Sequence, residues 1–324
     1  MRTTTKSISP AQFSQAENLG QLYKLLETIG VGPGWNKPEP SLWTRPKKNF
    51  LPAHFSYQTG RAALDAAGKF VSTKLAERRN LILANPVAGN NYATARTIVA
   101  AYQMVKAHEE ARSHRHTPNA LRLVMEAGPK VYTVVDGKKI PMLPGDVLLT
   151  PNWSWHGHNN ESDECAYWID FLDAPLVHLL EPMFLESFSG SFVEKTNAVD
   201  EESSFRYPFS NIKKRLENLP ETQPGLRDLL LGPKTLETLD LHVLRLDAGK
   251  SFSDKKSTAN SVFAVMDGQG ASVIEDQEYH WGCGDVFVVP SWNTHAYNAE
   301  IQSHLLRVTD EPVMKRFNWL RQEA

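Results

Sequence analysis

The stretch GDVLLTPNWSWH, residues 145–156, recurs as GDVFVVPSWNTH at residues 284–295. Six of the twelve positions are identical, and the two stretches begin 139 residues apart. An upstream pair, LRLVMEAG at residues 121–128 and SVFAVMDG at residues 261–268, repeats at an offset of 140. This spacing is far longer than the period of a solenoid repeat, so it predicts a duplicated domain.

Each copy has the pattern of β-structure, with short runs of β-branched residues separated by turn residues such as the Asp136–Gly137 pair. Helix-like patterns lie outside the copies, at residues 11–29, at the start of residues 60–83, and in NIKKRLENL at residues 211–219. The sequence therefore predicts a mainly β protein with two β-barrel (jelly-roll) domains. Its predicted parts are a partly helical N-terminal arm (1–90), barrel one (91–185), a helical connector (186–235) and barrel two (236–324).

Composition narrows the function classes. The 324 residues include 35 basic and 37 acidic side chains, for a net charge of −2, which does not favour nucleic acid or an anionic membrane as a partner. The N-terminus lacks the apolar core of a signal peptide, and there is no apolar run long enough for a membrane span. The chain has only two cysteines, Cys165 and Cys283, and two cysteines so far apart in the sequence do not form a disulfide framework. We expect a cytoplasmic protein.

Three histidines of the first copy form a candidate metal site. His114 and His116 are two residues apart, so in a strand both side chains point to one face. His156 ends the repeated motif and can face this pair from a neighbouring strand. A single histidine in a strand is usually structural, but this combination at matching places of a duplicated β-domain favours metal binding. Three neutral imidazoles leave other positions open, which suits a redox metal that binds substrate and O₂ together.

These motifs resemble those of the cupin superfamily, and the duplication resembles a bicupin. HRHTPNALR at residues 114–122 and PNWSWHGH at residues 151–158 resemble the gentisate 1,2-dioxygenase family, which includes salicylate and 1-hydroxy-2-naphthoate dioxygenases. Many cupins carry a glutamate ligand four residues after the second histidine, where this chain has Ala120. The resemblance implies Fe(II) on three histidines and an extradiol-type ring cleavage by O₂. The substrate would be a 2-hydroxybenzoate, cut between its carboxyl- and hydroxyl-bearing carbons.

The substrate carboxylate needs a cationic partner, and the spacing of Arg122 from His116 favours an inward-facing guanidinium over a rim ion pair. His158, two residues after His156, is predicted to face inward as an acid/base group, a hydrogen-bond donor or a fourth ligand. The resemblance adds four more positions. Either Arg78 or its neighbour Arg79 would reach the site from the N-terminal arm. Gln103 would be a pocket residue or an ordinary polar residue of a strand. Asp170 would be a carboxylate that orients a site residue, or a cap at the end of a strand.

The second copy serves as an internal comparison. An alignment through Gly128 and Gly268 places Asp254 over His114 and Lys256 over His116, and only His295 retains its place. A charged lysine has no lone pair to offer a metal. We therefore expect barrel two to be metal-free and structural.

Three functions remain open from the sequence. The first is an Fe(II) ring-cleaving dioxygenase acting on gentisate, a substituted salicylate or 1-hydroxy-2-naphthoate. The second is a non-oxidative cupin that binds a sugar or effector, and the third is a metal-dependent isomerase or decarboxylase. The small residues Val99, Ala100 and Ala101 would leave room for a ring substituent in the first case. The expected partners are the aromatic hydroxy acid and O₂, with the helical arm serving as an interface in a homodimer or tetramer.

Overall fold

The structure is a computed structural model that describes residues 8–190, 198–232 and 236–323. The chain divides into two units, residues 1–47 and residues 48–324. In the described part of the first unit, the helix predicted over residues 11–29 is two helices, α1 (Pro10–Ser14) and α2 (Leu19–Thr28). The break has a local cause, because Asn18 is extended and its side chain accepts a hydrogen bond from the Gln21 N–H at 3.0 Å, which starts a new helix.

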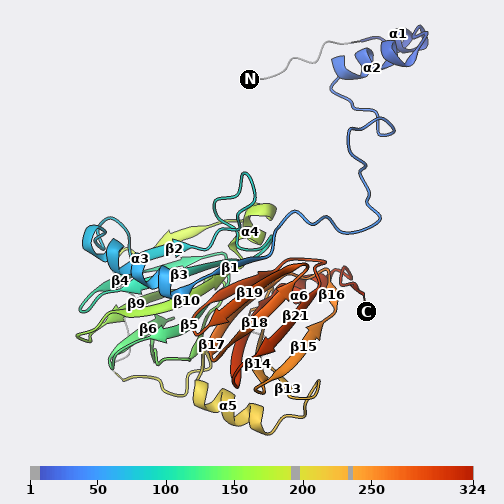
Figure 1. Ribbon diagram of the computed structural model, residues 1–324. Helices are drawn as coiled ribbons and strands as arrows, with labels where there is room; N and C mark the ends of the chain where they lie inside the picture. The colour runs from blue at the N-terminus through green and yellow to red at the C-terminus, as the bar shows by residue number, and fades with distance from the viewer. Residues whose placement is uncertain (1–7, 191–197, 233–235, 324) are drawn as a thin grey trace. The chain divides into compact units, whose positions relative to one another are not determined.

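The second unit contains two jelly rolls, each built from two antiparallel sheets packed face to face (Figure 1). The first jelly roll has a six-stranded sheet in the order β12 (Arg206–Tyr207), β8 (Val147–Thr150), β5 (Ala120–Glu126), β10 (Ala166–Leu172), β3 (Val99–Val105) and β2 (Arg79–Ile82). Its five-stranded sheet runs β11 (Leu185–Ser187), β4 (Glu110–His116), β9 (His156–Asn160), β6 (Val131–Val135) and β7 (Lys138–Pro141). Val124 and Trp168 of one sheet pack with Val135 and Ile140 of the other.

The second jelly roll repeats this plan. Its six-stranded sheet runs β1 (Ala53–Phe55), β20 (Val286–Val289), β17 (Ser261–Asp267), β22 (Ser303–Thr309), β14 (Asp240–Leu246) and β13 (Leu226–Leu230). Its second sheet runs β15 (Lys250–Asp254), β21 (His295–Ala299), β18 (Gln269–Ile274) and β19 (Gln277–Gly282), and a short pair joins β16 (Lys256–Ser257) to β23 (Gln322–Glu323). The predicted mainly β bicupin fold is confirmed. The sheets face each other as jelly rolls and do not close into continuous barrels.

Each half contributes a strand to the other half's jelly roll. The N-terminal strand β1 pairs with β20 of the second jelly roll, and β12, from the segment between the copies, pairs with β8 of the first. A helix follows each exchanged strand, α3 (Tyr57–Phe70) after β1 and α5 (Phe209–Glu217) after β12. The predicted arm and connector thus each contain one copy of a strand–helix–strand unit, β1–α3–β2 in the arm and β12–α5–β13 in the connector. Of the other helices in the described residues, α4 (Ala174–Leu180) follows β10 and α6 (Glu311–Arg316) follows β22, at equivalent places in the two halves.

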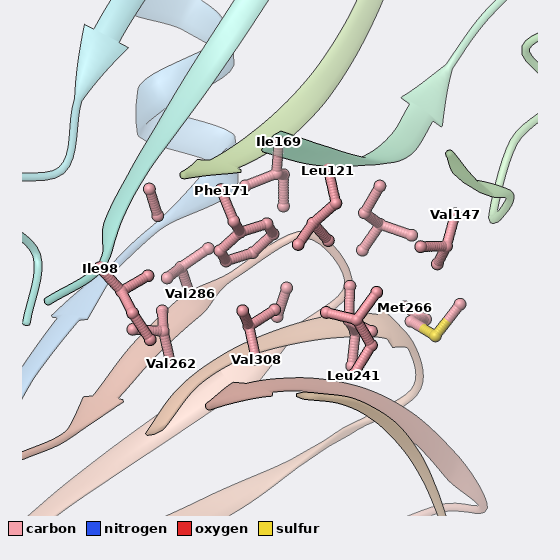
Figure 2. Packing of buried hydrophobic residues seen from close by; sticks show 14 of the residues in the cluster. Ile98, Leu121, Val147, Ile169, Phe171, Leu241, Val262, Met266, Val286 and Val308 are labelled. Atoms are coloured by element: carbon pink, nitrogen blue, oxygen red, sulfur yellow. The ribbon is translucent and has the colours of Figure 1, made fainter. Parts of the chain in front are cut away.

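The two six-stranded sheets pack back to back across the largest apolar core (Figure 2). Leu121 and Phe171 of the first sheet meet Val262 and Val308 of the second within this core. Alternation along the strands then fixes the opposite faces, so Arg122 and Val124 of β5 and Trp168 and Asp170 of β10 point into the first jelly roll. The interior polar residues of that jelly roll are consequently enclosed between two sheets.

The structure corrects the alignment of the upstream repeat by one residue. The N–H of Val124 donates to the carbonyl of Asp146, and the carbonyl of Val124 accepts from the N–H of Gly145. Val265 makes the same two backbone hydrogen bonds with Asp285 and Gly284, so Val124 and Val265 are equivalent. This register places Phe263, not Val262, at the position of Arg122. A shift of one residue reverses the face of a strand. Val262 accordingly lies in the core between the sheets, whereas Phe263 lies inside the second jelly roll.

Among the helices of the described residues, none is long and apolar enough to cross a lipid bilayer.

Candidate metal centre and substrate pocket

Three imidazoles converge inside the first jelly roll. His114 and His116 lie on β4, and His156 begins β9, its antiparallel neighbour, directly opposite His114. The ring centroid of His156 is 4.4 Å from that of His114 and 4.8 Å from that of His116. One nitrogen from each of the three residues lies within 4.8 Å of the others. This geometry permits all three to bind one ion.

The backbone fixes the tautomer of each of these rings. The Nδ1 atoms of His114, His116 and His156 lie 3.2, 2.8 and 2.9 Å from the carbonyl oxygens of Arg112, Pro118 and Ser154. A carbonyl oxygen only accepts hydrogen bonds, so each Nδ1 carries the proton and donates it. The Nε2 lone pair of all three rings is left available to a metal.

Burial keeps these imidazoles uncharged. It lowers the pKa of His114 and of His116 to about 4, and nearby positive charge from Arg78 acts in the same direction on both. Burial also lowers the pKa of His156 well below its usual value. Neutral imidazoles are the form that binds metal. The donor set therefore fits a first-row divalent ion, with three protein nitrogens and further positions for small ligands.

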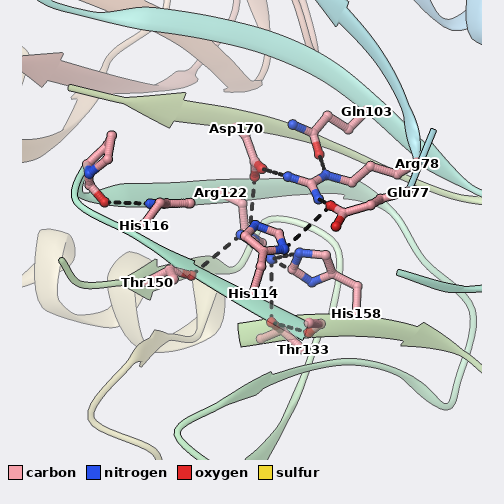
Figure 3. Close-up of polar contacts among 12 residues, drawn as sticks. Glu77, Arg78, Gln103, His114, His116, Arg122, Thr133, Thr150, His158 and Asp170 are labelled. Atoms are coloured by element: carbon pink, nitrogen blue, oxygen red, sulfur yellow. Dashed lines mark hydrogen bonds and ion pairs between the residues drawn. The ribbon is translucent and has the colours of Figure 1, made fainter. Parts of the chain in front are cut away.

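Arg122 and His158 lie beside this centre, and both are buried (Figure 3). Nη1 of Arg122 is 2.7 Å from Nδ1 and 2.8 Å from Nε2 of His158, so the guanidinium donates to whichever ring nitrogen lacks a proton. Burial and the Arg122 charge lower the pKa of His158 well below its usual value. His158 is therefore a neutral partner of Arg122. It is also outside the three-histidine group found among the described residues.

Asp170 faces Arg122 across neighbouring strands. Its Oδ1 is 3.3 Å from Nε of Arg122 in an ion pair, but neither atom has a hydrogen-bond partner. The side chains of Arg122 and Asp170 are 1% and 2% exposed. Besides the contact of Nη1 with His158, Nη1 and Nη2 of Arg122 make long contacts, of 3.4 and 3.5 Å, to hydroxyls of Thr133 and Thr150. A buried guanidinium whose Nε has no hydrogen-bond partner is suited to receive an anion.

Of the two neighbouring arginines, only Arg78 reaches this pocket. Its Nε donates to Oε1 of Gln103 on β3, and its Nη2 is 4.0 Å from Oδ2 of Asp170. Arg79 points away and is paired with Glu109 and with the Val71 carbonyl. Arg78 directly precedes β2, which begins at Arg79, and the two side chains point to opposite sides of the chain.

Sequence reasoning missed Glu77. Its Oε2 accepts from Nη1 of Arg78 at 3.2 Å and lies 3.4 Å from Nδ1 of His114, so it joins the arginine to a metal-ligand candidate (Figure 3). Its only sequence signal is its place beside Arg78. Trp168 was also missed, and its ring lies 5.2 Å from that of His158. It is one of many apolar residues on strands that face the interior, which gives no functional signal.

Two further arginines of the first half, Arg96 and Arg115, contact aromatic rings. The guanidinium of Arg115 sits 4.6 Å from the rings of both Trp153 and Trp155, which accords with a packing role. Arg96 lies over the ring of Phe50. Ala120 is buried in β5 and leaves the place of the common cupin glutamate without an acid.

The equivalent place in the second jelly roll holds a different set of groups. Asp254 pairs with His295 across β15 and β21, as His114 pairs with His156. Nδ1 of His295 lies 3.3 Å from Oδ2 of Asp254, and Lys256 forms an ion pair with Glu323 at 3.3 Å. Within the described ranges, no three-ligand group is found here.

Comparisons with known proteins agree with this architecture. The cupin domain family matches residues 101–172. The chain is 30% identical to 5-aminosalicylate 1,2-dioxygenase of Comamonas sp, over 95% of this chain and 90% of that protein. It is 29% identical to gentisate 1,2 dioxygenase 1 of Aquipseudomonas alcaligenes, over 93% of this chain and 95% of that protein. A crystal structure of salicylate 1,2-dioxygenase from Pseudoaminobacter salicylatoxidans, in adducts with gentisate, superposes with a TM-score of 0.87 at 29% identity, covering 95% of this chain and 94% of that one.

Proposed function

Because the chain belongs to the gentisate and salicylate 1,2-dioxygenase family of bicupins, which are metal-dependent ring-cleaving dioxygenases, we propose that it uses Fe(II) to open a 2-hydroxybenzoate. The bond cut lies between the carboxyl- and hydroxyl-bearing carbons. The extradiol label does not suit this position, since it describes cleavage beside two adjacent hydroxyls, and the relatives do not support it. The observation that carries the proposal is the three-imidazole group beside the buried guanidinium of Arg122, whose Nε has no hydrogen-bond partner.

The iron would be held by Nε2 of His114, His116 and His156, and it would supply the positions at which an ortho-hydroxy carboxylate and O₂ meet. Arg122 and Arg78 supply positive charge for the substrate carboxylate, whose planar shape matches the guanidinium fork. Gln103 orients Arg78 by accepting from its Nε. Asp170 lies between the two arginines and orients both of them.

His158 is proposed to hold or pass a proton. Its neutral ring is held by Arg122, and one of its nitrogens carries a proton that a substrate oxygen can accept. The low pKa of His158 means that the ring does not store a proton at neutral pH. We therefore assign it as a hydrogen-bond donor to the substrate that can shuttle a proton only transiently.

The decisive experiment is a substrate panel under air with Fe(II) supplied. Iron content, O₂ uptake and the absorbance of ring-opened product are measured with gentisate, salicylate and substituted salicylates. We expect consumption of one O₂ per ring opened. The matched pair His156→Ala and His295→Ala controls for folding, because the two residues occupy equivalent strand positions. The first variant should lose iron and activity and the second should keep both. An iron-loaded protein that consumes no O₂ with any of these acids would refute the proposal, and turnover without O₂ would favour an isomerase or decarboxylase.

Substrate choice is proposed to depend on β3. Val99 and Ala101 lie on the same face of β3 as Gln103, and Ala101 pairs with Asp170. Ala100, which the sequence grouped with them, lies instead in the core between the sheets. The small side chains of Val99 and Ala101 would leave room for a ring substituent.

A Val99→Trp variant tests this. Filling that space should lower kcat/KM for 5-substituted salicylates by about tenfold or more relative to unsubstituted salicylate, since steric fit is worth about 1–3 kcal/mol. The measurement is the ratio of the two kcat/KM values. An unchanged ratio would mean that Val99 does not face the substituent.

A further inference from the structure

The second jelly roll contains a polar cavity at the place equivalent to the active site. Its volume is about 260 Å³, and its lining includes Gln223, Asp254, Ser261, Phe263, His295 and Arg307. The register shows the equivalence, because Phe263 pairs with Arg307 across β17 and β22, as Arg122 pairs with Asp170 across β5 and β10. The cavity of the second jelly roll therefore lies at the strand positions that hold the metal centre in the first, with different side chains around it.

The guanidinium lies on β5 in the first jelly roll, and in the second it lies on β22, the equivalent of β10. Where the first jelly roll has Arg122 facing an aspartate, the second has Phe263 facing Arg307. Alternation along β22 points Arg307 inward, because its neighbours Leu306 and Val308 lie in the core between the sheets. The side chain of Arg307 is 18% exposed.

Arg307 is incompletely paired. It forms a long ion pair with Asp228, with Nη2 and Oδ2 3.6 Å apart, and Asp228 already accepts a hydrogen bond from Nδ1 of His242 at 2.6 Å. Nε of Arg307 is buried and has no hydrogen-bond partner. A buried guanidinium donor without an acceptor is costly, and a ligand carboxylate would satisfy it with the bidentate geometry that arginine prefers.

The cavity also has an aromatic wall. Phe263 lines it and stacks on Phe287, with centroids 4.8 Å apart and planes 6° from parallel. The ring of His295 is 5.2 Å from Phe263 and stacks on Tyr297 at 4.6 Å. Planar rings pack well against such a surface. The acidic side chains of Asp254 and Glu311 also line the cavity, which disfavours ligands with several negative charges.

We infer that the second jelly roll binds a planar aromatic monocarboxylate, with its carboxylate on Arg307 and its ring against Phe263. The ligand is held without a metal and is not cleaved, so the site is a binding site and not a second active site. This inference does not depend on which acid the first jelly roll opens.

The test counts benzoate molecules bound per chain. Benzoate lacks the ortho-hydroxyl of the proposed substrates, and calorimetric titration of the full-length, metal-free protein under nitrogen gives its stoichiometry. Two variants remove the site by different routes. Arg307→Gln removes the charge, and Ser261→Phe fills the cavity from β17 without touching the arginine. We expect the stoichiometry to fall by one in both variants, and Arg307→Lys to bind benzoate at this site about tenfold more weakly.

An unchanged stoichiometry in both Arg307→Gln and Ser261→Phe overturns the inference, as does a wild-type protein that binds no benzoate. Thermal unfolding of each variant checks that the fold is retained, and the filled cavity remains a test if the arginine variant is unstable. Ring cleavage is measured on the same iron-loaded variants and should be unaffected. The two measurements are independent of each other. If benzoate stoichiometry falls in the variants but no acid is cleaved, the proposed function fails and this inference stands. If the acids are cleaved but the stoichiometry does not fall, this inference fails and the proposed function stands.

Discussion

At the scale of single residues, the pocket of the first jelly roll is organised by backbone hydrogen bonds and by burial. Carbonyl oxygens fix the tautomers of the three histidines, so the Nε2 lone pairs face one another before any ion arrives. Burial lowers their pKa values and keeps these nitrogens unprotonated. A preformed neutral donor set reduces the reorganisation needed for metal binding.

These lowered pKa values predict how the stability of the metal-free protein depends on pH. His114 and His116 titrate near pH 4 when folded, against 6.5 for an ordinary histidine. Between these values the unfolded chain binds more protons than the folded one, so stability falls as the pH falls. Each histidine contributes a slope of about 1.4 kcal/mol per pH unit within this window. Urea unfolding of chelator-treated protein at pH 4.5–7 measures it.

The slope has a matched control. His114→Gln removes one titrating group and should flatten the dependence, whereas replacing His280, whose side chain is 75% exposed, should leave it unchanged. A stability that is constant between pH 6.5 and 4.5 would contradict the buried, neutral state of these rings.

The adjacent arginines provide a second prediction. Arg78→Gln should raise KM for the aromatic acid about 10- to 100-fold, because a charged hydrogen bond is worth about 1.5–3 kcal/mol. Arg79→Gln should leave KM unchanged and lower the free energy of unfolding by about 2 kcal/mol, because it removes the buried guanidinium from the partly buried Glu109 and leaves that carboxylate only Lys106 as a partner. Steady-state kinetics and urea unfolding of both variants check this. A larger KM effect in Arg79→Gln would reverse the assignment.

At the scale of elements, the repeated GDV motif holds the exchanged strands in place. Asp146 accepts from the Phe209 N–H at 3.0 Å and from Nε of Arg206 at 2.7 Å. Its counterpart Asp285 accepts from the Tyr57 N–H at 2.8 Å. The glycine before each aspartate has a φ of +85° and packs against the aromatic ring that begins α3 or α5. The motif is therefore retained in both halves for assembly, independently of metal binding.

This role predicts the effect of Gly145→Ala. A Cβ there would lie 2.5 Å from Cδ1 of Phe209, and the φ of +85° adds strain. We expect a loss of about 2–4 kcal/mol in the free energy of unfolding. Gly89→Ala is the control, because it shares a positive φ but has no atom within 4 Å of the added Cβ, and it should cost only about 1–2 kcal/mol. Equal losses in urea unfolding would show that packing against Phe209 contributes nothing.

At the scale of the whole molecule, the two jelly rolls are joined by reciprocal contacts. Asp173 accepts from the Asn119 N–H at 2.8 Å and from the hydroxyl of Thr238 in the second half. Asp310 accepts from the Asn260 N–H at 2.7 Å and from the hydroxyl of Thr97 in the first half at 2.5 Å. Because of these contacts, the exchanged strands and the shared core, we expect the two halves to unfold as one cooperative unit.

Truncation tests that unity. A chain of residues 48–190 lacks β12 and exposes the apolar face that packs on the second sheet, so it should show no cooperative thermal unfolding. A chain of residues 48–324, which contains the whole second unit, should melt within a few degrees of the full protein. Circular dichroism during heating measures both. A sharp melting transition in the 48–190 fragment would show that the first jelly roll folds alone.

Local patterns in the sequence were sufficient to predict the duplication, the β-structure and the convergence of His114, His116 and His156. A period of two, turn residues and an identical motif act over a few residues, so they can be read without knowing the partner strands. The functional roles of these residues remain proposals. The tertiary structure decided how segments that are distant in the sequence pair with one another, and therefore which way their side chains point. It selected Arg78 over Arg79, placed Phe263 opposite Arg307, turned Ala100 into the core between the sheets, and exchanged β1 and β12 between the halves. Which face of a strand is buried depends on its register with a partner far along the chain, and a slip of one residue reverses it.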